Sequence, residues 1–202
     1  MKKILSSVLF LFIVIAANAQ TTAEEFYNNG NTKVLLKDYR AAVLNYNSAI
    51  ALNPNYAEAY YGLGQAKEKM EDYFSAFKAY DNALKINPEY GDVYLSMGKA
   101  NIELGEYDKA EDNFNNLLKL KPVNPDAYFL LAGVKVRQRE YAKAIELYNQ
   151  FIELKQDNPD AYYDRASAKV IVGDNSGACF DLTRAKELAG TKIFKEILVV
   201  CK

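Results

Sequence analysis

The sequence predicts an all-α fold, a solenoid built from helical hairpins, and three observations point to it. A 34-residue period runs through most of the chain. Within each period, apolar residues recur at i, i+3, i+4 and i+7, which is typical of amphipathic helices. Asn-Pro pairs and short polar segments return at fixed places in the period, where they end one helix before the next begins.

The first segment, residues 1–19, has the three parts of a secretory signal peptide. Lys2 and Lys3 precede an uncharged, mainly apolar run over residues 4–17, and Ala17-Asn18-Ala19 offers small residues for cleavage. An uncleaved membrane anchor is the alternative, but the run is shorter than the roughly 20 residues of a spanning helix. We therefore expect cleavage after Ala19 and a periplasmic or secreted protein of bacterial type.

Five superposed ladders with a step of 34 residues define the repeats that follow. They consist of alanines, of aromatic residues at two places, of prolines, and of small residues that are glycine in the first three repeats. The ladders are Ala42, Ala76, Ala110, Ala144 and Ala178; Phe26, Tyr60, Tyr94, Tyr128 and Tyr162; Tyr39, Tyr73, Tyr107 and Tyr141; Pro54, Pro88 and Pro122; and Gly30, Gly64, Gly98, Ala132 and Ala166.

Each period predicts two helices, as residues 57–90 illustrate. A first helix ends at the polar segment Glu71-Asp72-Tyr73, and a second helix carries an apolar stripe that includes Ala76 and Tyr80. Asn87-Pro88 ends the second helix, because the residue before proline disfavours the α region. Gly64 and Ala76 are expected where two helices cross closely, with aromatic rings filling the space beside them.

This pattern closely resembles the tetratricopeptide repeat. In the second repeat the matching residues are Tyr60, Leu63-Gly64, Tyr73, Ala76, Tyr80, Ala83 and Pro88. The resemblance implies a right-handed α-solenoid over residues 23–190, with repeats at 23–56, 57–90, 91–124, 125–158 and 159–192. The fifth repeat departs from the pattern, with Arg165 in place of Leu and Asn175 in place of Tyr, as terminal repeats often do.

The tail over residues 191–202 predicts a C-terminal capping helix that covers the last apolar face, and a frayed terminus is the alternative. Cys179 and Cys201 lie at equal distances from a turn at Ala189-Gly190-Thr191. An antiparallel tail helix would bring them to the same height, so the sequence predicts a disulfide between them. Two buried free thiols are the other possibility.

Composition argues against most catalytic and cofactor chemistry. The chain has no histidine, two cysteines and a net charge of −1, which excludes histidine-based triads and gives no support to nucleic-acid binding. We expect no enzyme activity, no cofactor and no metal site. Each repeat carries a carboxylate at its second position, where the helix dipole explains it better than acid–base or calcium chemistry does. These carboxylates are Glu24, Glu58, Asp92, Asp126 and Asp160.

In tetratricopeptide arrays the first helix of each repeat lines a concave groove, and the resemblance places repeat positions 2, 5, 9, 12 and 13 there. The groove would then carry an aromatic and aliphatic stripe edged by carboxylates, and we expect it to bind an extended or helical segment that is more apolar and basic than acidic. Packing is the competing explanation for Tyr27 and Tyr61, whereas Gly133 leaves space between Phe129 and Val136. The predicted groove residues are Tyr27, Tyr61, Leu95, Ile102, Phe129, Val136 and Tyr163.

The function predicted from these features is a non-enzymatic adaptor that holds a protein or peptide partner in its groove. The alternative is a structural subunit of a cell-envelope assembly that uses its convex face or its ends. The lysine and arginine residues with which some family members clamp a carboxylate are absent, since Tyr27, Asp92 and Ser96 stand at those places. The sequence does not identify the partner or the oligomeric state, and we expect no stable membrane span after signal cleavage.

Overall fold

The computed structural model describes residues 22–189 and residue 201 of the 202-residue chain. The predicted signal peptide at 1–19 lies outside the described residues. So does the predicted capping helix at 191–202, apart from Cys201.

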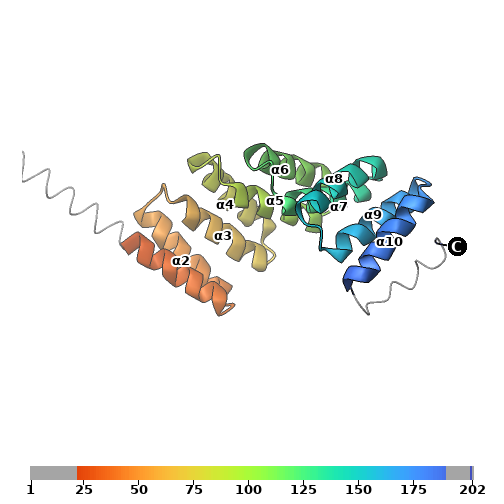
Figure 1. Cartoon of the computed structure of the whole chain (residues 1–202). Coiled ribbons are helices and arrows are strands. Elements are labelled where there is room, and N and C mark those ends of the chain that lie inside the picture. The colour runs from red at the N-terminus through yellow and green to blue at the C-terminus, as the bar shows by residue number, and fades with distance from the viewer. Residues whose placement is uncertain (1–21, 190–200, 202) are drawn as a thin grey trace, which may run out of the picture. The chain divides into compact units, whose positions relative to one another are not determined.

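Every regular element in the described part of the chain is an α-helix, which confirms the all-α prediction (Figure 1). Residues 22–35 are helical, and consecutive helices alternate in direction as hairpins (Figure 1). The helices that follow residues 22–35 are α2 (Tyr39–Leu52), α3 (Ala57–Lys69), α4 (Tyr73–Ile86), α5 (Gly91–Glu103), α6 (Tyr107–Leu120), α7 (Pro125–Arg137), α8 (Tyr141–Leu154), α9 (Pro159–Ile171) and α10 (Asn175–Ala189).

The chain forms two compact units, and the boundary between Val93 and Tyr94 falls inside α5. In the first unit α2 packs on α3, and α3 packs on α4. Tyr27 and Val34 of the first helix contact the buried cluster of Ala42, Tyr46 and Ala66. The first unit is thus two successive helical hairpins with the start of a third.

In the second unit each of the helices from α6 to α10 packs on the next one. The part of α5 in this unit contributes Leu95 and Ile102 to a core that contains Ala110 and Phe114. A separate core near the C-terminal end is built around Phe151 and other buried residues of α8, α9 and α10. Stacking of neighbouring repeats thus buries the apolar face that a single hairpin would leave exposed.

The small residues of the ladders lie at close helix crossings, as predicted. All five ladder alanines are at most 1% exposed. A Cβ atom added to Gly30 would lie 2.6 Å from the ring of Tyr46, and one added to Gly98 would lie 2.5 Å from the ring of Phe114. Glycine is therefore required here by the aromatic ring of the second helix, which occupies the space that a side chain would need.

The turn inside each hairpin has a left-handed backbone conformation, which glycine indicates in only some of the repeats. The fifteenth residue of every repeat adopts a positive φ, between 59° and 85°. Glycine occupies this place in two repeats, whereas lysine, glutamate and arginine occupy it in the others; the five residues are Lys37, Glu71, Gly105, Arg139 and Gly173. A left-handed residue reverses the chain after the first helix.

Capping side chains begin several of the helices. Asn124 and Asn158 accept hydrogen bonds from the backbone N–H of Ala127 (2.9 Å) and of Ala161 (3.1 Å), and Asp72 accepts one from Ser75 at the start of α4. Their side-chain oxygens satisfy backbone N–H groups that have no partner within the helix.

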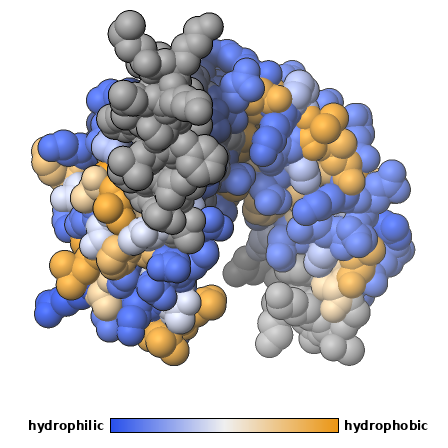
Figure 2. All heavy atoms as spheres, turned by 90° about the vertical axis from the view of Figure 1, so that its left-hand side faces the viewer, coloured by the Kyte–Doolittle hydropathy of each residue, from blue (hydrophilic) through white to orange (hydrophobic). Residues whose placement is uncertain are grey.

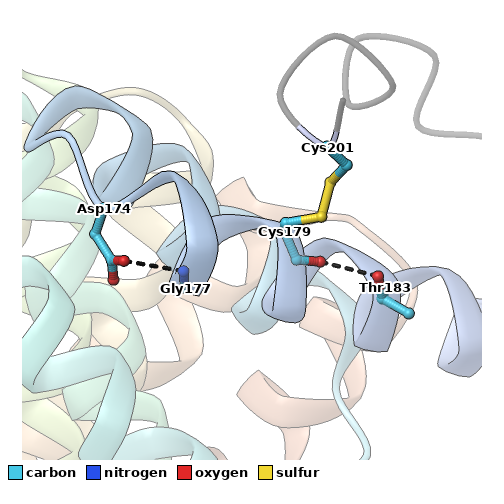
Figure 3. The surroundings of a disulfide bond; sticks show 5 residues. All are labelled: Asp174, Gly177, Cys179, Thr183 and Cys201. Atoms are coloured by element: carbon cyan, nitrogen blue, oxygen red, sulfur yellow. Dashed lines mark hydrogen bonds between the residues drawn. A yellow bond between two sulfur atoms is a disulfide. The ribbon is translucent and has the colours of Figure 1, made fainter.

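The structure joins Cys179 of α10 to Cys201 by a disulfide, with their Cα atoms 5.4 Å apart (Figure 3). This confirms the predicted pairing. Cys179 also lies within the regular backbone of α10, where its carbonyl accepts a hydrogen bond from the Thr183 hydroxyl at 2.9 Å. The bridge therefore fixes the position of Cys201 against the last helix of the described part of the chain.

Candidate functional site

The predicted groove residues lie on the first helices of the hairpins, and all seven are half-buried. We call the surface formed by repeat positions 2, 5, 9, 12 and 13 of these helices the first-helix face, and describe it separately in each unit. None of the seven side chains is fully exposed, because each also packs on the core of its own unit or against neighbouring rings.

In the first unit, the fifth-position tyrosines belong to a group of four rings. The ring centroid of Tyr27 lies 5.1 Å from that of Tyr56, and the centroid of Tyr61 lies 5.1 Å from that of Tyr90. All four side chains are half-buried. We name these four residues the tyrosine cluster. Tyr56 and Tyr90 end their repeats, and sequence analysis missed them, although an aromatic residue at that position occurs only in repeats one and two.

Carboxylates edge the tyrosine cluster. Burial raises the pKa of Tyr56, and the negative charges of Glu58 and Glu24 raise it further. Burial likewise raises the pKa of Tyr90, with added contributions from the charges of Glu58 and Asp92. These position-2 residues therefore act on the rings as well as on the helix dipole, and the edge of the cluster is electrostatically negative.

The rings of the cluster also pack on the second helices. Tyr27 lies 6.0 Å from the buried Tyr46, and Tyr61 lies 5.9 Å from the buried Tyr80. Burial raises the pKa of Tyr46 to about 12, and its hydroxyl donates a hydrogen bond to Asn31 at 2.7 Å. Tyr27 and Tyr61 thus pack partly on the core, so both explanations offered for them, core packing and surface exposure, apply together.

In the second unit, the ring of Phe129 packs mainly on buried core residues. Its ring centroid lies 5.8 Å from Tyr148 and 5.1 Å from Phe151, two residues that are at most 3% exposed. Tyr163 packs against two core clusters in the same way. Leu95 and Ile102 join the core around Phe114. The space predicted beside Gly133 is present, since no atom lies within 4 Å of the place where a Cβ would be.

A pocket of about 470 Å³ opens at Gly133. Side chains of α7, α8 and α9 and of the turn after α7 line it, and Val136 is the predicted groove residue among them. The lining consists of Gly133, Val136, Arg137, Arg139, Tyr141, Tyr148, Asp164, Ser167, Ala168 and Ile171. Most of these are ninth-, twelfth- and thirteenth-position residues or their neighbours, so the pocket belongs to the first-helix face of this unit.

Asp164 contributes a carboxyl group to the lining of the pocket. Burial raises the pKa of this carboxyl to about 6, and the nearby charge of Asp160 adds to the increase, while a hydrogen bond from the Tyr148 hydroxyl opposes it. Arg137 and Arg139 contribute exposed cations to the same lining. The pocket therefore combines a poorly solvated carboxyl group with two guanidinium groups, and sequence analysis identified none of the three.

A second polar cluster is buried between α9 and α10. Asp181 is fully buried, and both its oxygens accept hydrogen bonds from Arg165, at 2.8 and 2.5 Å. Lys169 adds an ion pair at 2.8 Å, and Arg165 also donates to Asn149 at 2.7 Å. Arg165 stands where two other repeats have Leu63 and Leu131. Because each of these charged groups has a partner, this cluster stabilises the packing of the last repeat and is not a ligand site.

Large apolar side chains are exposed elsewhere in the chain. On the coloured surface of Figure 2, hydrophobic residues form separate patches among hydrophilic ones. Leu44 and Phe180 occupy the same repeat position on the second helices α2 and α10, and each is 69% exposed, while Phe74 of α4 is 84% exposed. These second-helix residues were not predicted as an interaction surface.

The described residues contain no group of three or more His, Cys, Asp or Glu side chains that could hold a metal ion. Within residues 22–189, no helix combines the length and the apolar character needed to cross a membrane.

The fold and the repeated first-helix face define a class of protein, a helical-hairpin repeat protein. Three family models of tetratricopeptide repeats match residues 30–71, 69–118 and 95–159, which together cover the chain from 30 to 159 without a gap. The chain belongs to the tetratricopeptide repeat proteins. A comparison with curated protein sequences gave no match.

Solved structures share this fold over most of the chain. A crystal structure of MamA is 24% identical with a TM-score of 0.76, and the match covers 85% of this chain and 96% of that one. YrrB, described as a TPR protein with an unusual peptide-binding site, is 20% identical with a TM-score of 0.72, over 83% of this chain and 86% of YrrB. Pseudomonas aeruginosa pilF is 16% identical with a TM-score of 0.74, over 91% and 82%. At these identities the likeness concerns the fold.

Proposed function

We propose that this protein is a non-enzymatic adaptor that binds a segment of a partner protein along its first-helix face. The observation that carries the proposal is the tyrosine cluster. Four half-exposed tyrosine rings gather on one face of the first unit, each held from behind by the core or by another ring. Rigid aromatic surface of this kind is enriched among residues that dominate protein–protein binding energies.

The pocket at Gly133 supports the same proposal in the second unit. It lies on the first-helix face and could receive one side chain of a bound segment. YrrB, which shares the fold, is described as having a peptide-binding site, and this agrees with an adaptor role without showing it for the present chain.

The proposed compartment is the periplasm or the cell exterior. The signal-like sequence at residues 1–19 motivates this proposal, and the disulfide between Cys179 and Cys201 is consistent with it, because such bridges persist in oxidising compartments. Expression of the full chain with a C-terminal tag, followed by fractionation and N-terminal sequencing, tests it. A protein that keeps Met1 and stays in the cytoplasm would refute the proposal.

The adaptor proposal is tested by photo-crosslinking from matched positions. A benzoylphenylalanine is placed at Gln65, which is exposed on α3, or at Phe74, which is exposed on α4. We expect the Gln65 variant to crosslink a discrete partner segment, identified by mass spectrometry, and the Phe74 variant to crosslink little. Crosslinks from Phe74 alone would refute the adaptor proposal.

A structural subunit of an envelope assembly is the second candidate. The exposed Leu44, Phe74 and Phe180 on second helices favour it, because isolated second-helix surfaces have no evident reason to be this apolar. The same pair of crosslinking variants separates the candidates, since an assembly through second helices gives products from Phe74 and none from Gln65.

A further inference from the structure

The first-helix face of the first unit has a chemical preference that can be read from its charges. The tyrosine cluster presents aromatic rings, whose faces are electron-rich. Around it stand the position-2 carboxylates Glu24, Glu58 and Asp92, all exposed. Burial comes first among the causes that raise the pKa values of Tyr56 and Tyr90, and the charged side chains that add to it are these carboxylates.

Among the described residues, two of these carboxylates have no ion-pair partner. Glu24 and Glu58 form no ion pair with any residue of the described range 22–189. Asp126, at the same repeat position in the second unit, differs, because Lys155 lies 3.6 Å from it. The face of the first unit thus keeps negative charge that the second unit partly neutralises.

Resting on the proposed adaptor function, we propose that the tyrosine cluster, with Glu24 and Glu58 beside it, binds an arginine or lysine side chain of the partner segment. The cation would lie against the solvent-accessible parts of the half-buried Tyr27 and Tyr61 rings and near the carboxylates. A cation over an aromatic ring is attracted by the ring quadrupole, and the attraction grows as water is excluded. The long aliphatic stem of either side chain would cover the apolar part of the rings.

The ring geometry confines this site to the first unit. The four rings meet in two pairs, each with centroids 5.1 Å apart. The second unit lacks this arrangement, because Asn124 and Asn158 occupy the places of Tyr56 and Tyr90.

The test uses a small cation and its neutral isostere as probes on the full chain. Butylguanidinium carries the guanidinium of an arginine on an alkyl stem, and butylurea has nearly the same shape without the charge. The ring signals of the 16 tyrosines are followed by NMR on protein labelled with ¹³C at the tyrosine ring and assigned by single Tyr→Phe substitutions. We expect butylguanidinium, and not butylurea, to shift Tyr27, Tyr56, Tyr61 and Tyr90 in a saturable way.

Charge variants provide the matched comparison. Glu58→Gln keeps the shape of an exposed side chain and should weaken butylguanidinium binding by about two- to fivefold. Asp126→Asn, at the same repeat position, should leave it unchanged. Equal shifts with butylurea, shifts confined to tyrosines of the second unit, or no saturable shift would each overturn the inference.

This experiment needs no partner protein, so its outcome is separate from that of the crosslinking test. Crosslinks from Gln65 without butylguanidinium binding would refute the basic side chain and leave the adaptor function standing. Butylguanidinium binding without such crosslinks would support the cation preference of the tyrosine cluster and count against the adaptor function.

Discussion

At the scale of single residues, two glycines with open surroundings differ in their backbone conformation. Gly105 has a φ of 71°, and Gly133 lies in the regular helix α7, yet neither has an atom within 4 Å of the place of a Cβ. Steric crowding therefore plays no part at either site. The backbone conformation alone determines whether a substitution by alanine stabilises or destabilises the protein.

Gly105→Ala should lower the free energy of unfolding by about 1 kcal/mol, because an L-residue is strained in the left-handed region. Gly133→Ala should raise it by up to about 1 kcal/mol, since alanine is the better helix former. Urea denaturation of the two variants beside the wild type measures both. Changes of the same sign would contradict the turn conformation described for position 15.

Asp164 is the residue that should respond to pH. Its pKa of about 6 lies above that of an unfolded aspartate, which is about 4. Between these values the folded protein holds a proton that the unfolded chain has released, so the contribution of Asp164 to stability falls as pH rises from about 4 to 6.

Asp164→Asn should remove this dependence. The free energy of unfolding of the wild type minus that of the variant should therefore decrease as pH rises from 4 to 7, and the ¹³C signal of the Asp164 carboxyl should titrate near pH 6. A midpoint near 4, with a stability difference that does not depend on pH, would show that the carboxyl is well solvated.

At the scale of helices, α9 and α10 are joined by an ion pair at two positions that are apolar in the second repeat. Asp181→Ala should cost about 3–5 kcal/mol, because it leaves Arg165, whose side chain is 12% exposed, without its carboxylate. The double variant Arg165→Leu, Asp181→Ala restores the residue types found at these two positions in the second repeat, Leu63 and Ala79.

We expect the free energy of unfolding of the double variant to be much closer to that of the wild type than the value for Asp181→Ala is. Replacing a buried ion pair by apolar residues is often neutral for stability. Thermal and urea unfolding of the two single variants and the double variant complete the cycle. Additive losses would show that the two side chains act independently, contrary to the 2.8 Å hydrogen bond between them.

The disulfide acts on the element at the end of the described range. It closes a separation of 22 residues, so removing it with Cys179→Ala, Cys201→Ala should lower stability by about 3 kcal/mol in the chain-entropy model. Intact mass after alkylation of the denatured, unreduced protein checks the bridge itself. Two alkylated thiols would show that it had not formed.

At the scale of the whole chain, the repeat period made the order of helices predictable. Glu71-Asp72-Tyr73 and Asn87-Pro88 predicted the ends of α3 and α4, and the structure confirms both. Gly64 and Tyr80 were predictable as partners because a close crossing needs a small residue opposite a large one. These features depend on local chemistry that recurs every 34 residues.

The candidate site was less predictable, because it depends on residues that break the period. Tyr56 and Tyr90 join the cluster through contacts between neighbouring repeats, which a pattern within one repeat does not reveal. The raised pKa of Asp164 depends on its burial in the folded chain, and the partner of Arg165 is Asp181, 16 residues away. For Arg165, the signal in the sequence was a charged residue at a position that is leucine in two other repeats.

The proposed function requires a partner segment to lie along the first-helix face. Hydrogen exchange, measured on the protein with and without the partner captured through Gln65, shows whether it does. We expect slower exchange in residues 22–35, α3, α7 or α9, with exchange in α4 and α8 unchanged. Protection confined to the second helices α2, α4, α8 and α10 would contradict it.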